Sequence, residues 1–170
     1  MLEFIRNLGQ RPDLEAGERL PLDYAARCKA RQRALLESGR EAGLFLERGR
    51  MLAEGDVLVA ADDTLALVLC KPEEVTSAVA GDWRLLARGC YHLGNRHTPA
   101  QIGNLWLRIQ PDPVLEAMLE RLGFSLRRET APFVPEGGAY APGLPQAHSH
   151  GHSLIRSHSR AHSLADEGGA

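Results

Sequence analysis

The sequence predicts an α+β fold with a small N-terminal antiparallel β domain (1–72), a ferredoxin-like βαββαβ domain (73–141) and a disordered, histidine-containing tail (142–170). Three observations support this prediction. The first region holds short apolar or alternating segments divided by Gly and Asp turns, which is typical of β structure. The second carries two helical patterns among strand patterns. The third is rich in Ser, His, Gly, Ala and Arg and has little to bury.

Alternating residues identify the first strands. In "ARCKARQRALLESG" the alternation places four cations on one strand face, namely Arg27, Lys29, Arg31 and Arg33. We interpret this face as a solvated outer surface; the alternative is a docking face for an acidic partner protein. The segments "LFLERG", "VLVA" and "TLALVLC" follow between turns and predict a small antiparallel sandwich or barrel-like domain. Lys71-Pro72 is the expected boundary.

The second region begins with a β-branched segment, "EEVTSAVA", which predicts a strand. Asp82 is then placed to cap a helix over "WRLLARGCYHLGN". The expected buried stripe of that helix is Trp83, Leu86, Cys90 and Leu93. Gly94-Asn95 is expected to end the helix as a left-handed cap.

The rest of this region supplies two further strands, a helix and a last strand. "TPAQIGNLWLRIQ" predicts a strand pair with a tight turn at Gly103-Asn104. In "PDPVLEAMLERLGF", Asp112 caps a helix, Pro113 takes its first turn and Gly123 stops it. The expected buried face is Leu115, Met118, Leu119 and Leu122. "FSLRRET" completes the β-α-β-β-α-β order, in which two helices cover one face of a four-stranded antiparallel sheet.

Composition excludes several classes of protein. A formal net charge of −2 offers no electrostatic basis for binding nucleic acid. No signal peptide and no apolar run of roughly 18 residues is present, so we expect a cytoplasmic protein without a membrane partner. The common hydrolase and NTPase signatures GxSxG, HExxH and GxxxxGK[ST] are missing. The three separated cysteines, which are Cys28, Cys70 and Cys90, are expected to be reduced thiols that act as small buried filler.

Five of the seven histidines fall near the C-terminus. They are His148, His150, His152, His158 and His162. Neutral imidazole prefers nickel, copper, zinc and cobalt over magnesium or calcium, so this segment predicts binding of a transition metal. A mobile donor set with no fixed carboxylate suits capture and transfer better than catalysis. An expression tag or a chance cluster is the alternative interpretation.

The two remaining histidines, His92 and His97, flank the end of the first predicted helix. His92 lies off the apolar stripe and is expected to be exposed on the helix. His97 is expected in the loop after it. By itself, a lone loop histidine is most simply a solvated side chain.

Several motifs resemble the urease accessory protein E family of nickel metallochaperones. "YHLGNRHTPAQI", "DPVLEAMLERLGF" and "APFVPEGGAY" carry the resemblance, and "LESGREAGLFLERGRMLAEGDVL" is similar to that family's first domain. The resemblance implies a cytoplasmic homodimer, not an enzyme, that carries Ni(II) as cargo to the urease apoprotein. It implies work with the other urease accessory proteins, including the GTPase.

The resemblance also implies a site. The family's ligand at the end of "GNRH" falls on His97, and in that picture two copies of His97 meet across the dimer interface. Nickel takes four to six donors, so we expect the tail histidines to complete the set, and Zn(II) or Cu(II) to bind the same site in vitro. Some members carry further histidines where this chain has Gln110, Pro111 and Pro113, so no second surface site is expected there.

Two alternative functions stay open on the sequence. The protein could be a general buffer or store for Ni, Zn or Cu, with no recipient protein. Less consistent with the sequence is a metal-dependent enzyme, which would need an ordered carboxylate or a third histidine near His97.

Overall fold

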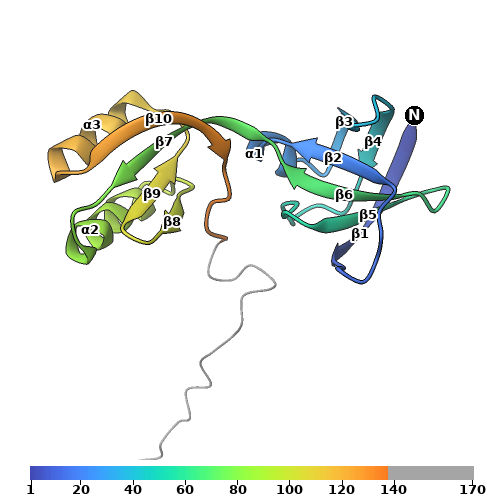
Figure 1. Ribbon diagram of the computed structural model, residues 1–170, viewed down its shortest axis with the longest axis horizontal. Helices are drawn as coiled ribbons and strands as arrows, with labels where there is room; N and C mark the ends of the chain where they lie inside the picture. The colour runs from blue at the N-terminus through green and yellow to red at the C-terminus, as the bar shows by residue number, and fades with distance from the viewer. Residues whose placement is uncertain (138–170) are drawn as a thin grey trace, which may run out of the picture. The chain divides into compact units, whose positions relative to one another are not determined.

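The computed structural model describes residues 1–137; residues 138–170 lie outside the description, and the predicted tail at 142–170 falls among them. The strands of the described part belong to two sheets, one built from β1 (Leu2–Gln10) to β6 (Leu65–Cys70) and the other from β7 (Pro72–Val79) to β10 (Ser125–Pro132) (Figure 1). Helices α2 (Trp83–Gly94) and α3 (Pro113–Leu122) accompany the second sheet, and the short helix α1 (Tyr24–Arg27) belongs to the first part of the chain.

The first sheet has six strands in the order β2-β6-β5-β1-β4-β3. Their bounds are β1 (Leu2–Gln10), β2 (Glu18–Leu22), β3 (Arg31–Leu35), β4 (Glu41–Phe45), β5 (Asp56–Ala60) and β6 (Leu65–Cys70). β1 pairs with β4 in parallel and β2 pairs with β6 in parallel, while the other pairs are antiparallel. The prediction of an antiparallel domain is therefore wrong for two of the five pairs. Alternation of apolar and polar residues identifies a strand, but it does not identify the strand that pairs with it. That pairing depends on packing between residues that are distant in the sequence.

Side chains from the strands of this sheet form one buried hydrophobic cluster. Phe4 of β1 pairs with Leu44 of β4, and both side chains are fully buried. Leu20 and Val68 bring β2 and β6 into the same cluster. Burial of each such side chain stabilises the fold by about 1.5–3 kcal/mol.

Residues 24–30 differ from the predicted strand. Tyr24–Arg27 form helix α1, whose first turn is capped by the Asp23 carboxylate, which accepts from the Ala26 N–H at 2.8 Å. Arg27 is buried, and its guanidinium donates to the carbonyls of Leu52 and Phe133. Arg27 therefore does not belong to the exposed basic face. The carbonyl partners that make its burial tolerable are distant in sequence, so alternation could not reveal them.

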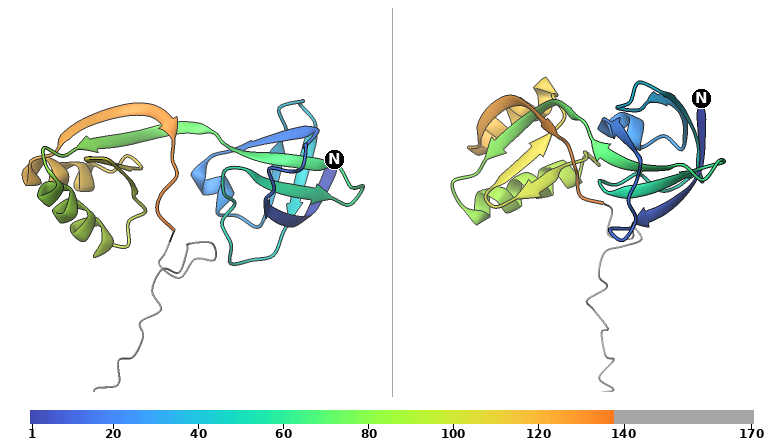
Figure 2. Two further views of the ribbon diagram at one scale, coloured as in Figure 1. Left: turned by 60° about the horizontal axis from the view of Figure 1, so that its bottom comes forward. Right: turned by 45° about the vertical axis from the view of Figure 1, so that its right-hand side comes forward.

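The second sheet has four antiparallel strands in the order β10-β7-β9-β8. Their bounds are β7 (Pro72–Val79), β8 (Gln101–Gly103), β9 (Trp106–Ile109) and β10 (Ser125–Pro132). Helices α2 (Trp83–Gly94) and α3 (Pro113–Leu122) lie on one face of this sheet (Figure 2). Leu93 of α2 and Leu119 of α3 join Leu107 of β9 in one buried cluster.

Helix α2 begins as predicted but buries a shorter stripe. The Asp82 carboxylate accepts from the Leu85 N–H at 2.7 Å. Trp83 is 62% exposed, so the buried stripe starts at Leu86 rather than at Trp83, because the first turn extends past the edge of the apolar cluster. Gly89 allows the close approach of Phe124: a Cβ on Gly89 would lie 2.5 Å from the Phe124 ring.

Helix α3 begins and ends where the sequence predicted. Asp112 accepts from the Val114 and Leu115 N–H groups at 2.8 and 3.0 Å, and Gly123 ends the helix with φ of 107°. Of the predicted buried face only Leu119 is fully buried, while Leu115, Met118 and Leu122 are half-buried against the cluster.

The turn between β8 and β9 lies one residue later than predicted, at Asn104-Leu105. Gly103 remains in β8 because its partner Trp106 lies against it: a Cβ on Gly103 would come within 2.1 Å of the indole ring. Leu105 takes the left-handed conformation instead, with φ of 60°.

The cysteines divide by environment. Cys70 is buried, Cys90 is half-buried and Cys28 is exposed, so the expectation of buried filler fails for Cys28, which lies on the surface after α1. Burial, with the nearby Glu54 carboxylate, raises the pKa of the Cys70 thiol to about 12.

Among the helices formed by residues 1–137, none combines the length and apolarity needed to cross a membrane.

Candidate metal centre

The described part of the chain contains two histidines, and both lie at the C-terminal end of α2. His92 belongs to the last turns of the helix, and His97 comes three residues after the helix ends at Gly94. The five histidines between residues 148 and 162 lie outside the described residues.

His97 occupies a defined position in the turn that ends the helix. Its N–H donates to the Gly94 carbonyl at 3.0 Å, and the Thr98 N–H donates to the Leu93 carbonyl at 3.2 Å. This pair of hydrogen bonds is the Schellman motif, which satisfies the last carbonyls of a helix. Because Leu93 is fully buried, the motif ties the His97 backbone to the core. His97 is therefore a fixed residue rather than one on a loose loop.

The left-handed residue of this turn is His97 itself, with φ of 52°. The prediction placed it at Gly94-Asn95, but Asn95 has φ of −62° and continues the right-handed path. Glycine is usual at this position because a Cβ costs about 1 kcal/mol in the left-handed region. The chain instead places a histidine there, so the turn holds a side chain with a Cβ in the conformation that glycine adopts most easily.

The surroundings of His97 favour a cation. The side chain is exposed, and it lies directly beyond the C-terminus of α2. The dipole of α2 places partial negative charge at this end of the helix and stabilises a nearby cation, although its last carbonyls already accept hydrogen bonds. Within residues 1–137, no three groups among His, Cys, Asp and Glu gather closely enough to hold a metal ion by themselves. Any ion bound at His97 would need donors from outside this part of the chain.

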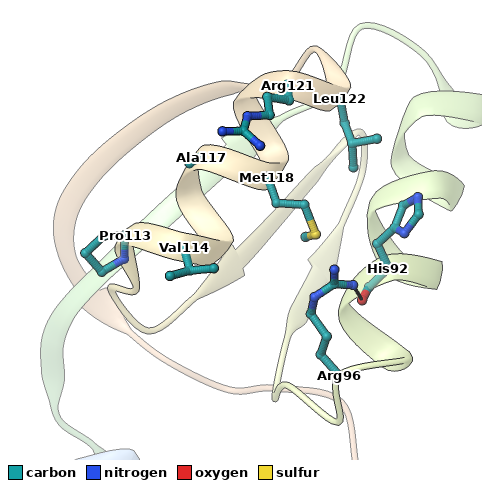
Figure 3. Close-up of a pocket in the computed structure, with 8 residues that line it drawn as sticks. All are labelled: His92, Arg96, Pro113, Val114, Ala117, Met118, Arg121 and Leu122. Carbon is teal, nitrogen blue, oxygen red and sulfur yellow. Dashed lines mark hydrogen bonds between the residues drawn. The ribbon is translucent and has the colours of Figure 1, made fainter.

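His92 lies in a different environment. It is half-buried in a groove between α2 and α3, and its carbonyl accepts from the Arg96 Nη1 at 2.8 Å. Figure 3 shows His92 and Arg96 on one side of the groove and Met118 and Arg121 on the other. Two guanidinium groups in one groove repel a metal cation, so the geometry does not favour His92 as a ligand. The expectation of a freely exposed His92 also fails.

The chain after β10 returns to the segment just beyond the His97 turn. The Val134 N–H donates to the Gln101 Oε1 at 3.1 Å, and the Glu136 N–H donates to the Ala100 carbonyl at 2.9 Å. Ala100 is only three residues after His97. The described chain therefore ends beside the His97 turn, and the histidine-bearing residues continue from that point in the sequence.

Buried residues hold this returning segment. The Phe133 side chain is fully buried, its ring lies 5.1 Å from the Tyr24 ring, and its carbonyl accepts from Arg27. Pro135 is buried as well. Sequence reasoning assigned no role to these residues, although the apolar and proline positions of "APFVPE" were a usable signal for an ordered segment.

The half-buried thiol of Cys90, seven residues before His97 in the sequence, is a poor metal ligand. Burial raises the pKa of Cys90, and the Glu136 carboxylate raises it further. The thiol of Cys90 therefore stays protonated near neutral pH, whereas metal binding needs a thiolate.

The fold and the site together define a class: an α+β protein with two sheets, in which the described chain ends beside a histidine turn and five further histidines follow in the sequence. Comparison with known families makes the assignment specific. Residues 1–71 match the family model described as UreE urease accessory protein, N-terminal domain, and residues 73–163 match UreE urease accessory protein, C-terminal domain. The chain belongs to the UreE family of urease accessory proteins, which are accessory proteins and not enzymes.

Individual relatives agree with this assignment. The chain is 47% identical over 141 residues to the urease accessory protein UreE of Pseudomonas putida, covering 82% of this chain and 86% of that protein. It is 50% identical over 121 residues to the urease accessory protein UreE of Burkholderia ambifaria, covering 71% of this chain. The match spans 60% of the length of that Burkholderia protein and 58% of the one from Burkholderia lata. The family resemblance seen in the sequence is thereby confirmed.

Proposed function

We propose that this protein binds Ni(II) and delivers it to the urease apoprotein, together with the other urease accessory proteins, including the GTPase. Membership of the UreE family supports a role in urease maturation. The observation that carries the metal site is the hydrogen bond from Glu136 to Ala100, since it holds residue 136 near the His97 turn and His148 follows 12 residues later in the sequence. One fixed imidazole and several others thereby become available to one ion.

The donor count argues for a homodimer. A single His97 per chain leaves most positions of a nickel ion empty, whereas an isologous contact brings two copies together. The elements around His97 expose apolar side chains that such a contact would cover: Tyr91 is 66% and Ile102 is 40% exposed. β8 is also the edge strand of its sheet in the described part of the chain. In our proposal the two His97 residues form the fixed half of the site.

The C-terminal histidines supply the other half. His148 comes 12 residues after Glu136, and an extended chain of that length spans at most about 40 Å. His150 and His152 come next at alternate positions, and His158 and His162 lie further along. All five are within reach of His97 without any special backbone geometry. We propose a mechanism in three steps. The C-terminal histidines capture the nickel ion, and the paired His97 residues then anchor it. The ion is released to the recipient as one imidazole at a time is exchanged.

The chemistry of imidazole determines how the cargo is held. Binding needs neutral rings, so affinity should decline as pH falls below about 6.5. Zn(II) and Cu(II) use the same donors, and copper should bind more tightly than nickel in vitro. The nickel assignment therefore rests on the urease-related family and not on the donor set.

We also propose the finer descriptions of the architecture. The βαββαβ order and the antiparallel sheet with both helices on one face support a ferredoxin-like second domain. The division between the two sheets near Pro72, and the meeting of the two family matches between residues 71 and 73, support domains at 1–72 and 73–141. A cytoplasmic location follows from the proposed recipient.

Isothermal titration calorimetry of His97→Ala tests the site. We expect this variant to lose the tightest nickel site per dimer while remaining folded and dimeric, because the His97 side chain is exposed. His92→Ala, a matched substitution on the same helix end, should keep the tight site. Unchanged tight binding by His97→Ala would rule out the assignment.

Delivery separates a chaperone from a metal buffer. Nickel-loaded protein should activate urease apoprotein complexes in the presence of a competing chelator, and His97→Ala should do so poorly. A buffer would release nickel to the chelator and the recipient alike. Activation equal to that by free nickel would therefore favour the buffer and contradict the chaperone proposal.

A further inference from the structure

Four cations surround one hollow in the first part of the chain. The hollow lies between residues 28–31 and residues 48–51, and Lys29, Arg31, Arg48 and Arg50 line it. All four residues are exposed. This cluster occurs in a chain whose formal net charge is −2, so it is a local concentration and not a consequence of composition.

The cations of this hollow are poorly compensated. Arg50 contacts the buried Asp56 carboxylate at 3.4 Å. Within residues 1–137, no ion pair within 4.0 Å involves Lys29, Arg31 or Arg48. No Asp or Glu from that part of the chain lines the hollow either. Like charges that line one hollow repel one another, and an anionic ligand would relieve that repulsion.

The hollow is preformed by the backbone. The Leu46 N–H donates to the Ala30 carbonyl at 2.9 Å, and the Leu52 N–H donates to the Arg27 carbonyl at 2.9 Å. These two bonds tie the segment 46–52 to the segment 27–30 at both ends. A ligand would therefore meet a surface already in place, which reduces the entropy lost on binding.

The lining also has apolar character. Met51 is half-buried in this hollow. A second hollow shares Arg48 and Arg50, and it adds the exposed Ile5, the exposed Arg6 and one carboxylate, Glu47. The positive charge thus continues into the second hollow, where Glu47 offsets part of it, and the apolar surface extends there as well. A basic rim over apolar contacts, extended across two adjoining hollows, fits an elongated ligand that carries both carboxylates and apolar side chains.

We propose that this basic hollow is a docking site for an acidic, apolar-containing segment of a partner protein. A polypeptide is favoured over nucleic acid because, among residues 1–137, no aromatic ring lines either hollow to stack on a base, and the net negative charge of the chain opposes a long polyanion. The site lies on the first sheet's part of the chain and involves no residue assigned to the metal. Its existence is therefore independent of the proposed nickel function.

Fluorescence anisotropy with the metal-free full-length protein tests this site. The probe is a labelled peptide of alternating Glu and Leu, compared with one of alternating Gln and Leu and with an oligothymidylate of equal charge. We expect the Glu peptide alone to bind well and to weaken as salt rises. Arg31→Glu/Arg48→Glu should weaken that binding at least tenfold.

The control is Arg84→Glu/Arg88→Glu, which changes two exposed arginines of α2 by the same charge. It should bind the Glu peptide as the wild type does. Equal losses in both double variants, or tighter binding of the oligothymidylate than of the Glu peptide, would overturn the proposal. If Arg31→Glu/Arg48→Glu loses its circular dichroism spectrum, Arg31→Gln/Arg48→Gln replaces it, with a smaller loss expected in the same direction.

Discussion

His97 combines two properties that a simple turn residue would not need together. It has the left-handed conformation in which glycine is most stable, and it carries the imidazole that we propose as a metal ligand. The hydrogen bonds to Gly94 and Leu93 hold the backbone in that conformation whatever the side chain is. The structural and functional contributions of His97 can therefore be separated by substitution.

His97→Gly should stabilise the protein by about 1 kcal/mol relative to His97→Ala, because glycine removes the left-handed penalty while alanine keeps it. Both variants should lose tight nickel binding to the same extent. Urea unfolding and calorimetry on the two proteins measure these effects. Equal unfolding free energies for the two variants would contradict the strain assigned to His97.

At the scale of elements, Glu116 connects α3 to two strands of the second sheet. Its carboxylate accepts from the Thr76 hydroxyl of β7 at 2.6 Å and from the Arg128 Nη2 of β10 at 2.8 Å. The hydrogen bond from Arg128, followed by that from Thr76, lowers the pKa of Glu116. The ionised carboxylate is thus favoured in the folded state.

This shift predicts a pH-dependent contribution to stability. Since the folded pKa of Glu116 lies below the unfolded one, the contribution is present above the unfolded pKa and is lost as pH falls through the folded pKa. Glu116→Gln should lower the free energy of unfolding at pH 7, and the difference from wild type should shrink below about pH 4. Urea unfolding at several pH values measures it. Glu120→Gln, an exposed change on the same helix, should show neither effect.

At the scale of the whole molecule, we predict that the buried core forms without the C-terminal segment. The buried apolar side chains of the described part all precede residue 136. The bonds from Val134 and Glu136 to Gln101 and Ala100 also lie before the histidine-bearing residues. Within residues 1–137, the two buried clusters are formed by side chains of that range.

A chain that ends at Tyr140 should stay folded and dimeric but bind fewer nickel ions. Circular dichroism and light scattering report the fold and the dimer, and equilibrium dialysis counts the ions. The full-length His97→Ala variant is the useful comparison, since it should lose the tight site and keep weaker binding by the C-terminal segment. Unfolding on truncation would show that the segment belongs to the core.

Local signals explain what sequence reasoning predicted well. Asp82 and Asp112 cap the helices where expected, and Gly123 ends the second one. The family motif around "GNRH" identifies His97 as a candidate without any geometry. The errors concern residues whose state depends on distant partners: Arg27 is buried by the Leu52 and Phe133 carbonyls, and β1 and β2 find parallel neighbours.

The sequence alone therefore determined the two helices, the family and the candidate ligand, because caps, helical periodicity and motifs act over a few residues or are inherited as short patterns. Only the tertiary structure decided that His97 holds the left-handed position, that the chain returns to Ala100, and that four cations meet in one hollow. Each of these depends on hydrogen bonds or packing that the local pattern leaves open. A short stretch of sequence cannot specify such contacts, since residues at many distant positions could form the same hydrogen bond or fill the same space.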